Sequence, residues 1–227
     1  MSPSPAELAK MIDHSVLAAD TSRGQIEGAC RLAREMRVAA VCVMPAWTTA
    51  CAELLGGSGV ASGTAIGFPL GSHLVACKAL EARLAIERGA REIDFVMQIG
   101  AAKSGDWEAL EVDAREVVES VRSMEEEKGE KIPCKMILEC CYLNDEEKRR
   151  ACEIAVRVGA EFVKTSTGFG PSGATAEDVR LMREIVGEAL GVKAAGGIRT
   201  RAQALAMVEA GATRIGTSST VAILTAQ

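Results

Sequence analysis

Aromatic residues are scarce in this sequence and make up only 3% of its 227 residues. Proteins that bind single-stranded nucleic acid usually stack the bases on aromatic side chains, so a surface of that kind is not expected. The formal net charge is −5 and no basic arm or stripe is present, which also argues against binding to a polyanion. The core must therefore consist mainly of aliphatic side chains, which suits helices packed against a parallel sheet.

Long apolar runs and secretion signals are absent as well. No apolar run approaches the ~20 residues that a helix needs to span a bilayer, so we expect no membrane partner. The first residues, Met1–Pro5, lack the charged and then apolar pattern of a signal peptide. We therefore expect a cytoplasmic protein whose eight cysteines are reduced. The only histidines are His14 and His73, and without a cluster of cysteine and histidine ligands we expect no metal site.

Short apolar runs alternate with longer amphipathic segments along the whole chain. The runs expected to be strands are Met11–Leu17, Val38–Met44, Gly63–Phe68, Glu92–Ile99, Lys135–Cys141, Glu161–Thr165, Gly191–Ala195 and Thr213–Gly216. Helical patterns lie between them, as at 73–88 and 107–127. Others begin after the N-cap residues Asn144 and Thr175. The chain is thus expected to be a series of strand and helix units.

This alternation predicts one α/β domain over residues 1–227, a (β/α)8 TIM barrel with a short N-terminal helix. Gly-Ala pairs at 89–90, 159–160 and 211–212 each end a helical segment directly before a strand, as in repeated βα units. A doubly wound open sheet is the alternative architecture. It would be favoured by a Gly-x-Gly-x-x-Gly segment after the first strand, and no such segment is present there.

Two lysines, Lys164 and Lys193, stand at the ends of predicted strands just before glycine-rich loops. Because side chains alternate along a strand, both lysines and Asp94 are predicted to point into the barrel. Adjacent strands lie roughly 4.8 Å apart, and both a neighbouring positive charge and burial lower the pKa of a lysine from about 10.4. We therefore expect Lys164 to be partly neutral and to act as a nucleophile that forms a Schiff base with a carbonyl compound.

Strand lysines more often form ion pairs or extend to the surface than take part in catalysis. Two inward lysines beside the single inward carboxylate of Asp94 would, however, leave an unmatched buried positive charge, which is costly without a function. Three interpretations stay open: a Schiff-base aldolase, a barrel that only binds a phosphorylated sugar, and an α/β protein with no site. Formation of an imine distinguishes the first from the other two.

Small residues follow several predicted strands and are candidates for a phosphate site. They are Gly196, Gly197, Gly216, Ser218 and Ser219, with Thr167 and Gly168 as further donors. Backbone N–H groups at helix N-termini bind anions, and the loops after strands seven and eight are the usual phosphate site of this fold. The glycines could instead serve only to make the turns. Asp13 and Cys42, on the first two strands, are candidates to line the pocket.

Several segments together resemble the deoxyribose-phosphate aldolase family. They are Ile12–His14, Val41–Val43, Ile66–Gly71, Glu92–Asp94, Lys164–Thr175, Val192–Arg199 and Ala210–Gly216. The similarity runs from about Leu8 to Ser219, and the two lysine motifs within it are highly specific. The resemblance implies a class I aldolase that reversibly cleaves 2-deoxy-D-ribose 5-phosphate to acetaldehyde and D-glyceraldehyde 3-phosphate, as in deoxynucleoside catabolism.

The resemblance also implies a role for each candidate residue. Lys164 would form the Schiff base, Lys193 would favour loss of its proton and relay protons, and Asp94 would donate and accept protons through water. The glycine and serine loops would hold the substrate phosphate. No cofactor and no metal are implied, because the imine itself stabilises the carbanion. The expected partners are a phosphorylated sugar and acetaldehyde, in a homodimer or higher homo-oligomer, and a different phosphorylated sugar is the alternative substrate.

The sequence departs from the family's pattern at three places. Met44 and Gln98 stand where family members often have Asn, and Gln98 is predicted to face the barrel interior, so substrate contacts are expected to differ. Some members carry a C-terminal tail with a tyrosine that helps proton transfer. This chain ends at Gln227, and its single tyrosine is Tyr142. Proton exchange is therefore expected to rely on Asp94 and water.

Overall fold

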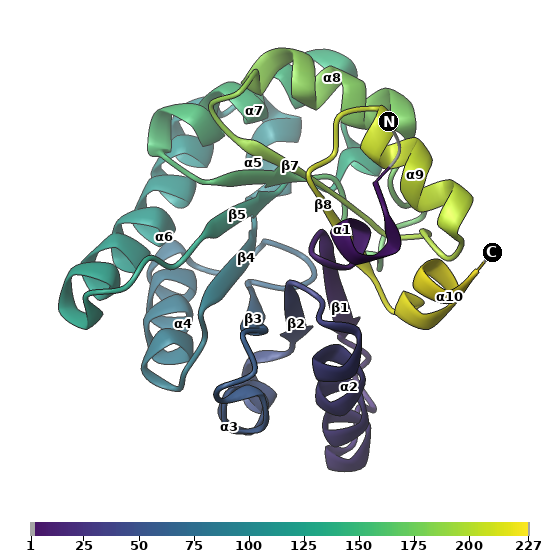
Figure 1. The fold of residues 1–227 in the computed structure, drawn as a ribbon. Helices are drawn as coiled ribbons and strands as arrows, with labels where there is room; N and C mark the ends of the chain where they lie inside the picture. Colours follow the sequence, from purple (N-terminus) through teal and green to yellow (C-terminus); the bar gives the residue numbers. More distant parts are fainter. Residues whose placement is uncertain (1–2, 227) are drawn as a thin grey trace.

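The computed structural model describes residues 3–226 and contains eight parallel strands that close into a barrel (Figure 1). The strands are β1 (Ile12–Val16), β2 (Ala40–Val43), β3 (Ala61–Ile66), β4 (Glu92–Val96), β5 (Cys134–Ile137), β6 (Phe162–Lys164), β7 (Gly191–Ala195) and β8 (Arg214–Thr217). Each strand pairs with the next along the chain, and β8 pairs with β1. The predicted TIM barrel is confirmed, whereas an open sheet would leave two unpaired edges.

Helices surround the barrel (Figure 1). They are α1 (Pro5–Ala9), α2 (Arg23–Met36), α3 (Thr48–Leu55), α4 (Val75–Glu87), α5 (Ile99–Ser104), α6 (Trp107–Lys128), α7 (Asp145–Val158), α8 (Ala176–Val186), α9 (Arg201–Glu209) and α10 (Thr220–Thr225). The short N-terminal helix that the sequence predicted is α1. Within residues 3–226, no helix is both long and apolar enough to cross a membrane. Some of the sequence predictions refer to the two ends of the chain. The described residues do not include Met1, Ser2 and Gln227.

Local sequence signals explain where the helices begin and end. The predicted N-cap residue Asn144 forms a capping box with Glu147 at the start of α7: the Asn144 side chain accepts from Glu147 N at 2.9 Å, and the Glu147 side chain accepts from Asn144 N at 2.7 Å. The predicted helix-ending glycines Gly89, Gly159 and Gly211 all have positive φ, at 100°, 79° and 110°. Glycine adopts this conformation at little steric cost. The βα repeat inferred from the Gly-Ala pairs is thus confirmed.

Most strands are shorter than the predicted apolar runs. β4 ends at Val96 because α5 begins at Ile99, and β5 ends at Ile137 because the backbone turns away at Glu139, which has a left-handed φ of 56°. A strand ends where its backbone hydrogen bonding ends, whereas apolar residues continue into the loops that cover the barrel. The strands predicted from periodicity therefore extended too far at the carboxyl ends of β4 and β5.

Apolar side chains form two separate cores. The larger lies between the strands and the helices and includes Ile93 and Phe95, and the smaller lies inside the barrel. The buried members of the inner core are Ala65, Phe68, Val96 and Ile137. Outward Ile93 and Phe95 and inward Val96 confirm the predicted alternation along β4. The inner core fills one part of the barrel interior and leaves the rest to polar side chains.

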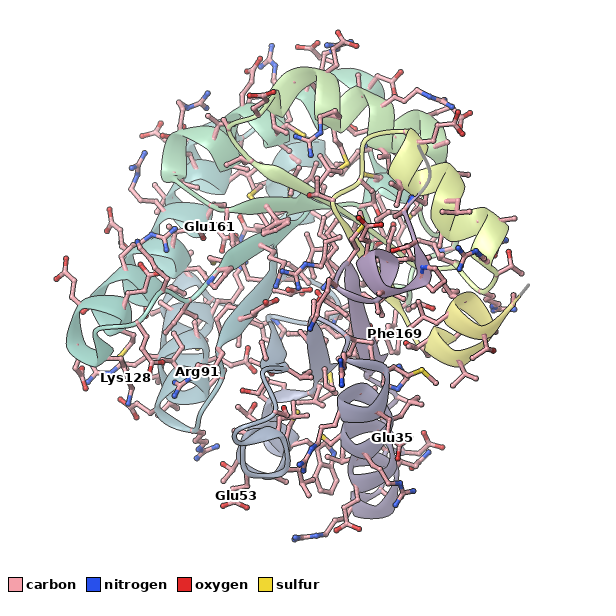
Figure 2. All side chains as sticks on the ribbon, in the orientation of Figure 1. Glu35, Glu53, Arg91, Lys128, Glu161 and Phe169 are labelled. Carbon is pink, nitrogen blue, oxygen red and sulfur yellow. The ribbon has the colours of Figure 1, made fainter. Side chains whose placement is uncertain are left out.

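Charged side chains cover the outer helices, as the labelled residues Glu35, Glu53 and Lys128 illustrate (Figure 2). All eight cysteines are free thiols in this structure. Among them, Cys30 and Cys51 bring their sulfur atoms within 3.8 Å of each other between α2 and α3.

Candidate active site

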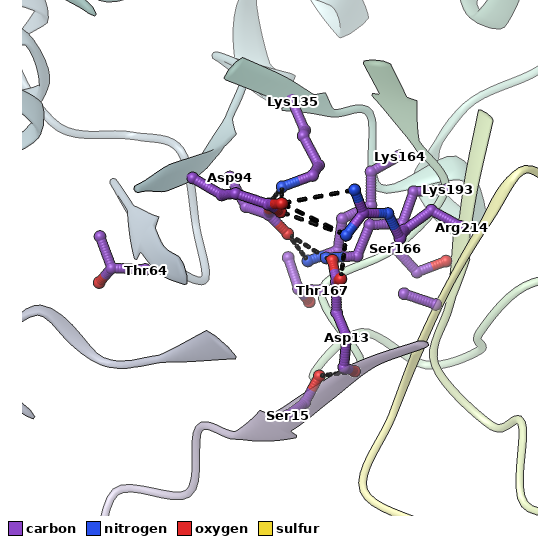
Figure 3. Close-up of polar contacts among 12 residues, drawn as sticks. Asp13, Ser15, Thr64, Asp94, Lys135, Lys164, Ser166, Thr167, Lys193 and Arg214 are labelled. Carbon is purple, nitrogen blue, oxygen red and sulfur yellow. Dashed lines mark hydrogen bonds and ion pairs between the residues drawn. The ribbon is translucent and has the colours of Figure 1, made fainter. Parts of the chain in front are cut away.

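Asp94 lies at the centre of a cluster of charged side chains inside the barrel (Figure 3). Its Oδ1 accepts a hydrogen bond from Lys135 Nζ at 2.9 Å, and its Oδ2 accepts from Lys164 Nζ at 2.8 Å and from Lys193 Nζ at 2.7 Å. The strand register explains this meeting, since Lys164 pairs with Lys193 and Asp94 with Lys135. The structure thus brings together Lys164, Lys193 and Asp94, each 2% exposed or less.

Three more charged residues belong to the cluster, and sequence analysis did not assign them to a site. They are Lys135, Glu92 and Arg214. Lys135 donates to Glu92 at 2.6 Å, and Arg214 donates to Asp13 at 2.7 Å and to Glu92 at 3.3 Å. A signal was present for Glu92, because it precedes Asp94 by two positions on β4 and therefore shares its face. No comparable signal was present in the sequence for Lys135 and Arg214, because their ion-pair partners lie on other strands that meet them only in the closed barrel.

The cluster contains more positive than negative groups. Its carboxylates are Asp13, Glu92 and Asp94, and its cations are Lys135, Lys164, Lys193 and Arg214. One positive charge is unmatched if every group is ionised. The surplus inferred from sequence is therefore present, although it is distributed over more residues than expected. Loss of one proton from a lysine amine would remove it.

Electrostatics keep Asp94 and Asp13 ionised. Burial favours the protonated form of Asp94, but the three lysines outweigh burial and hold the pKa of Asp94 well below its ordinary value. In the same way burial is outweighed at Asp13, where Lys193 is the strongest opposing charge, and the pKa of Asp13 is lowered to about 2. Burial works to lower the pKa of Lys193, yet Asp13 and Asp94 raise it above its ordinary value. Lys193 is therefore held as an ammonium ion.

A cavity of about 520 Å³ opens beside the cluster at the carboxyl ends of β1, β6, β7 and β8. We call it the larger cavity. Lys164 lines it, whereas Lys193 and Asp94 do not. The predicted phosphate-site residues that line it are Thr167, Gly168, Gly196, Gly197, Gly216 and Ser218. A ligand in this cavity would thus meet the amine of Lys164 and the predicted loops together.

Backbone donors are free at the larger cavity. The N–H groups of Gly196, Gly197 and Ser218 have no acceptor within residues 3–226, and all three residues line the cavity. Ser219, the remaining predicted residue, donates its N–H to Thr217 Oγ1 at 2.9 Å and does not line the cavity. Free N–H groups in a glycine-rich turn bind anions. Gly196, Gly197 and Ser218 are therefore the best placed donors for a phosphate.

Close packing explains two of the glycines near this cavity. A Cβ atom on Gly216 would lie 3.2 Å from Cε of Lys193, so the glycine leaves space for the lysine side chain. A Cβ atom on Gly173 would lie 2.2 Å from the carbonyl oxygen of Gly196. Ala174 N donates to that same oxygen at 3.0 Å. The loop after β6 is thereby joined to the loop after β7, so the glycines do more than form turns.

The larger cavity also has lining residues that sequence analysis did not single out. Ser15 comes from β1, Gln25 from the first turn of α2, and Arg199 from the loop after β7. Arg199 adds a positive charge to a cavity with free N–H donors, which favours an anionic ligand. The sequence feature that could have identified Arg199 as a site residue is its position in the Val192–Arg199 segment, which resembles the aldolase family.

Asp13 and Cys42 do not line the larger cavity. Asp13 points inward to Lys193 and Arg214, while the next residue, His14, faces outward and contacts Thr220 Oγ1 through Nδ1 at 2.9 Å. Alternation along β1 separates the two side chains, so the adjacent pair does not act together. Cys42 is buried, and burial, reinforced by Asp94, raises the pKa of its thiol to about 11.

The departures from the family's pattern lie at the rim of the barrel. Met44 is half-buried and packs against the inner core. Gln98 stands beyond the end of β4, at the N-cap of α5, and its backbone N–H donates to Asp113 at 3.0 Å. Strand alternation therefore does not govern the direction of Gln98, and this residue does not line the larger cavity.

A second cavity of about 440 Å³ lies on the other side of the loop that follows β6. We call it the smaller cavity, and its lining includes Leu70, Ile99 and Tyr142. Thr167 and Phe169 line both cavities. The turn from Thr167 to Gly170 therefore separates the cavity beside Lys164 from a more apolar one.

Known proteins resemble this chain over almost its whole length. Residues 8–225 match the model of a family described as DeoC/LacD family aldolase. A deoxyribose-phosphate aldolase of Aciduliprofundum boonei is 52% identical over 96% of this chain and 96% of its own length. One from Carboxydothermus hydrogenoformans is 50% identical over 97% of this chain and 95% of its own. The solved structure of the Aeropyrum pernix deoxyribose phosphate aldolase, described as a unique tetramer, superposes with a TM-score of 0.89. It is 31% identical, over 97% of this chain and 91% of that one.

Proposed function

The chain belongs to the DeoC/LacD family of aldolases, and from this premise we propose that it is a class I deoxyribose-phosphate aldolase. It reversibly cleaves 2-deoxy-D-ribose 5-phosphate to acetaldehyde and D-glyceraldehyde 3-phosphate through a lysine Schiff base. The relatives that are about half identical carry this activity in their names. A Schiff-base aldolase that takes another phosphorylated sugar is the second candidate, and substrate profiling separates the two.

The observation that carries the proposal is the different access of the two neighbouring lysines. Lys164 both contacts Asp94 at 2.8 Å and lines the larger cavity, whereas Lys193 contacts Asp94 at 2.7 Å without reaching the cavity. A carbonyl compound in the cavity meets the amine of Lys164. We therefore assign Lys164 as the nucleophile and Lys193 as its charged neighbour.

The first step is formation of the imine. The nucleophilic form of Lys164 is its unprotonated amine, and this side chain lines the larger cavity. That amine attacks C1 of the open-chain sugar and forms a carbinolamine. Loss of water, with a proton supplied to the leaving hydroxyl, produces the protonated imine. Lys193 is placed to relay this proton through Asp94, to which both amines donate.

The second step breaks the bond between C2 and C3 of the sugar. Asp94, held as a carboxylate by its lysines, accepts the proton of the C3 hydroxyl through a water molecule. The C2–C3 electron pair moves into the imine, so D-glyceraldehyde 3-phosphate leaves and an enamine stays on Lys164. Protonation of the enamine at C2 and hydrolysis of the imine release acetaldehyde and restore the amine.

The phosphate of the sugar is assigned to the loops after β7 and β8 that line the larger cavity. Gly196, Gly197 and Ser218 supply N–H donors, and Arg199 supplies a positive charge. With the phosphate there, C1 of the sugar is directed toward Lys164, which lines the same cavity. The phosphate thus supplies binding energy that positions the reacting carbon.

The experiment that tests the proposal is reduction with borohydride in the presence of acetaldehyde, followed by peptide mapping. We expect a stable adduct on Lys164, and we expect Lys164→Leu to fold normally but to lose both the adduct and aldolase activity. Lys128→Leu, on the exposed face of α6, is the control and keeps both. An adduct on Lys193 would reverse the assignment of the two lysines. A folded protein that binds inorganic phosphate without any adduct would instead be a binding protein.

Quaternary structure and location complete the proposal. The A. pernix relative is a tetramer, and we extend homo-oligomerisation to this chain, as a dimer or a larger assembly, to be measured by light scattering. A reducing compartment such as the cytoplasm suits the eight free thiols.

A further inference from the structure

Glu139 is a buried carboxylate that the proposed reaction does not use. It follows β5 and is only 2% exposed, and its backbone has φ 56° and ψ 62°. This left-handed conformation costs a residue with a side chain roughly 1–2 kcal/mol. Such strain persists only where the surroundings hold the residue in place, and it is concentrated at functional sites. The position therefore requires an explanation from its contacts.

The carboxylate of Glu139 is directed at the turn that follows β6. Its Oε1 accepts from Thr167 N at 3.1 Å, and its Oε2 accepts a short hydrogen bond from the Thr167 hydroxyl. The Thr167 hydroxyl oxygen in turn accepts from Phe169 N at 3.0 Å. A Cβ atom on Gly170 would lie 3.3 Å from Cδ of Glu139, so the turn passes directly over the carboxylate. Glu139 therefore organises the whole segment from Thr167 to Gly170.

Within residues 3–226, Glu139 has no ion-pair partner, since no lysine or arginine nitrogen lies within 4.0 Å of its carboxylate. A buried carboxylate is costly unless it is paired or hydrogen-bonded. At Glu139 the compensation comes from the two donors of Thr167, with a longer hydrogen bond from the Cys141 thiol to Oε1 at 3.8 Å. Both donors of Thr167 are occupied by Glu139, so the carboxylate acts mainly on the turn that follows β6.

This turn forms a wall of the larger cavity. Thr167, Gly168 and Phe169 line that cavity, and Phe169 packs edge to face on Phe68 with ring centroids 5.3 Å apart. Farther along the same loop, Ala174 N donates to the carbonyl oxygens of Ala195 and Gly196 at 3.1 and 3.0 Å. A shift of the turn would therefore disturb the loop that carries the free N–H groups. Lys164 is held separately, by its strand and by Asp94.

We propose that Glu139 is a positioning residue that holds the Thr167–Gly170 turn in place and thereby sets the affinity for the phosphate end of the substrate. The inference rests on the proposed function. It makes a prediction opposite to simple electrostatics: removing a negative charge near a phosphate should strengthen binding, whereas loss of the positioning contact should weaken it. Glu139→Gln, which keeps the size of the side chain, distinguishes the two.

The test compares kcat and KM of Glu139→Gln for 2-deoxy-D-ribose 5-phosphate and for unphosphorylated 2-deoxy-D-ribose. Loss of a hydrogen-bonded charge corresponds to about a 10- to 100-fold change in affinity. We expect KM for the phosphorylated sugar to rise by this factor while kcat changes by less than about 3-fold. For the unphosphorylated sugar kcat/KM should hardly change. Borohydride trapping of acetaldehyde on Lys164 should also persist.

Two sets of variants provide the controls. Thr167→Val removes the hydroxyl donor and should reproduce the rise in KM. Thr167→Ser keeps the donor and should recover most of the affinity. The double variant Glu139→Gln with Thr167→Val should have a KM no higher than that of the poorer single variant, because both substitutions remove the same contact. Glu125→Gln alters another buried carboxylate that accepts a loop N–H, from Ile132 at 2.7 Å ahead of β5. It should lower stability and leave KM unchanged.

Equal losses of kcat/KM for both sugars, or tighter binding of the phosphorylated sugar by Glu139→Gln, would overturn the positioning role. A wild-type KM in Glu139→Gln would also overturn it, as would additive effects of Glu139→Gln and Thr167→Val on KM. Failure of the proposed function looks different. In that case the unaltered protein itself forms no adduct with acetaldehyde.

Discussion

At the scale of single residues, Asp94 decides how the buried charges are arranged. Replacing all its lysine partners by apolar side chains would avoid the cost of burying ions, and natural cores usually do so. Instead, one carboxylate accepts hydrogen bonds from Lys135, Lys164 and Lys193 at 2.7–2.9 Å. A single group thus connects the proposed nucleophile with the ammonium beside it. In the proposed mechanism, this connection lets a proton pass between the two amines.

His14 gives a residue-scale prediction about pH. Burial lowers the pKa of His14 from its ordinary 6.5, so below about pH 6.5 the unfolded chain binds a proton before the folded one does. The stability linked to this lowered pKa is complete above pH 6.5 and is lost as the pH falls below it. We expect the urea midpoint of the wild type to fall more steeply between pH 7 and pH 5 than that of His14→Asn.

A substitution of the other histidine serves as the control for this pH effect. His73 is exposed, so His73→Asn should keep the wild-type slope. Identical slopes for the wild type and His14→Asn would show that His14 is free to take up a proton in the folded state.

At the scale of elements, α4 and α6 are joined by a fully buried ion pair between Lys78 and Asp113. Lys78 Nζ donates to Asp113 at 2.6 Å, to Gly71 O at 3.2 Å and to Val96 O at 3.0 Å. Asp113 accepts from Gln98 N at 3.0 Å. The pair therefore fixes the loops after β3 and β4 against the two helices that support them.

Removing one partner of this pair should destabilise the protein strongly. Lys78→Met leaves the Asp113 carboxylate buried without a cation, and we expect it to lower the free energy of unfolding by about 3–5 kcal/mol. Adding Asp113→Leu removes the orphaned charge and should restore part of the loss, as urea denaturation can measure. Lys128→Met, at an exposed position on α6, should change stability by less than about 0.5 kcal/mol. A double variant less stable than Lys78→Met would contradict this account.

At the scale of the whole molecule, barrel closure creates the site. The charged cluster draws its side chains from β1, β4, β5, β6, β7 and β8, and β8 reaches β1 only when the ring closes. Arg214 on β8 then meets Asp13 on β1 and Glu92 on β4. The opposing charges of β1 and β8 are therefore brought together only by the complete fold.

We predict that residues 1–227 behave as one domain and that neither half folds alone. A cut in the exposed connection after α6 separates residues 1–129 from residues 130–227. It exposes the paired edges of β4 and β5 and of β1 and β8, and it separates Asp94 from Lys164 and Lys193. Each fragment should lack a cooperative thermal transition in circular dichroism, with the intact chain as the control. A fragment with a sharp transition of its own would mean that the chain contains two units.

The sequence by itself determined the type of fold, because periodicity, capping residues and helix-ending glycines are local signals. Within the strands it also determined the inward direction of Lys164, Lys193 and Asp94, although it placed Gln98 on a strand that ends at Val96. Tertiary structure alone decided which side chains from distant strands meet. Lys135 and Arg214 joined the cluster through strand register, and Glu139 meets its hydrogen-bond partner Thr167, 28 positions along the chain, only in the folded loops. Register and loop packing depend on the closed barrel, since pairing between strands is set by the whole ring and not by any local pattern of residues.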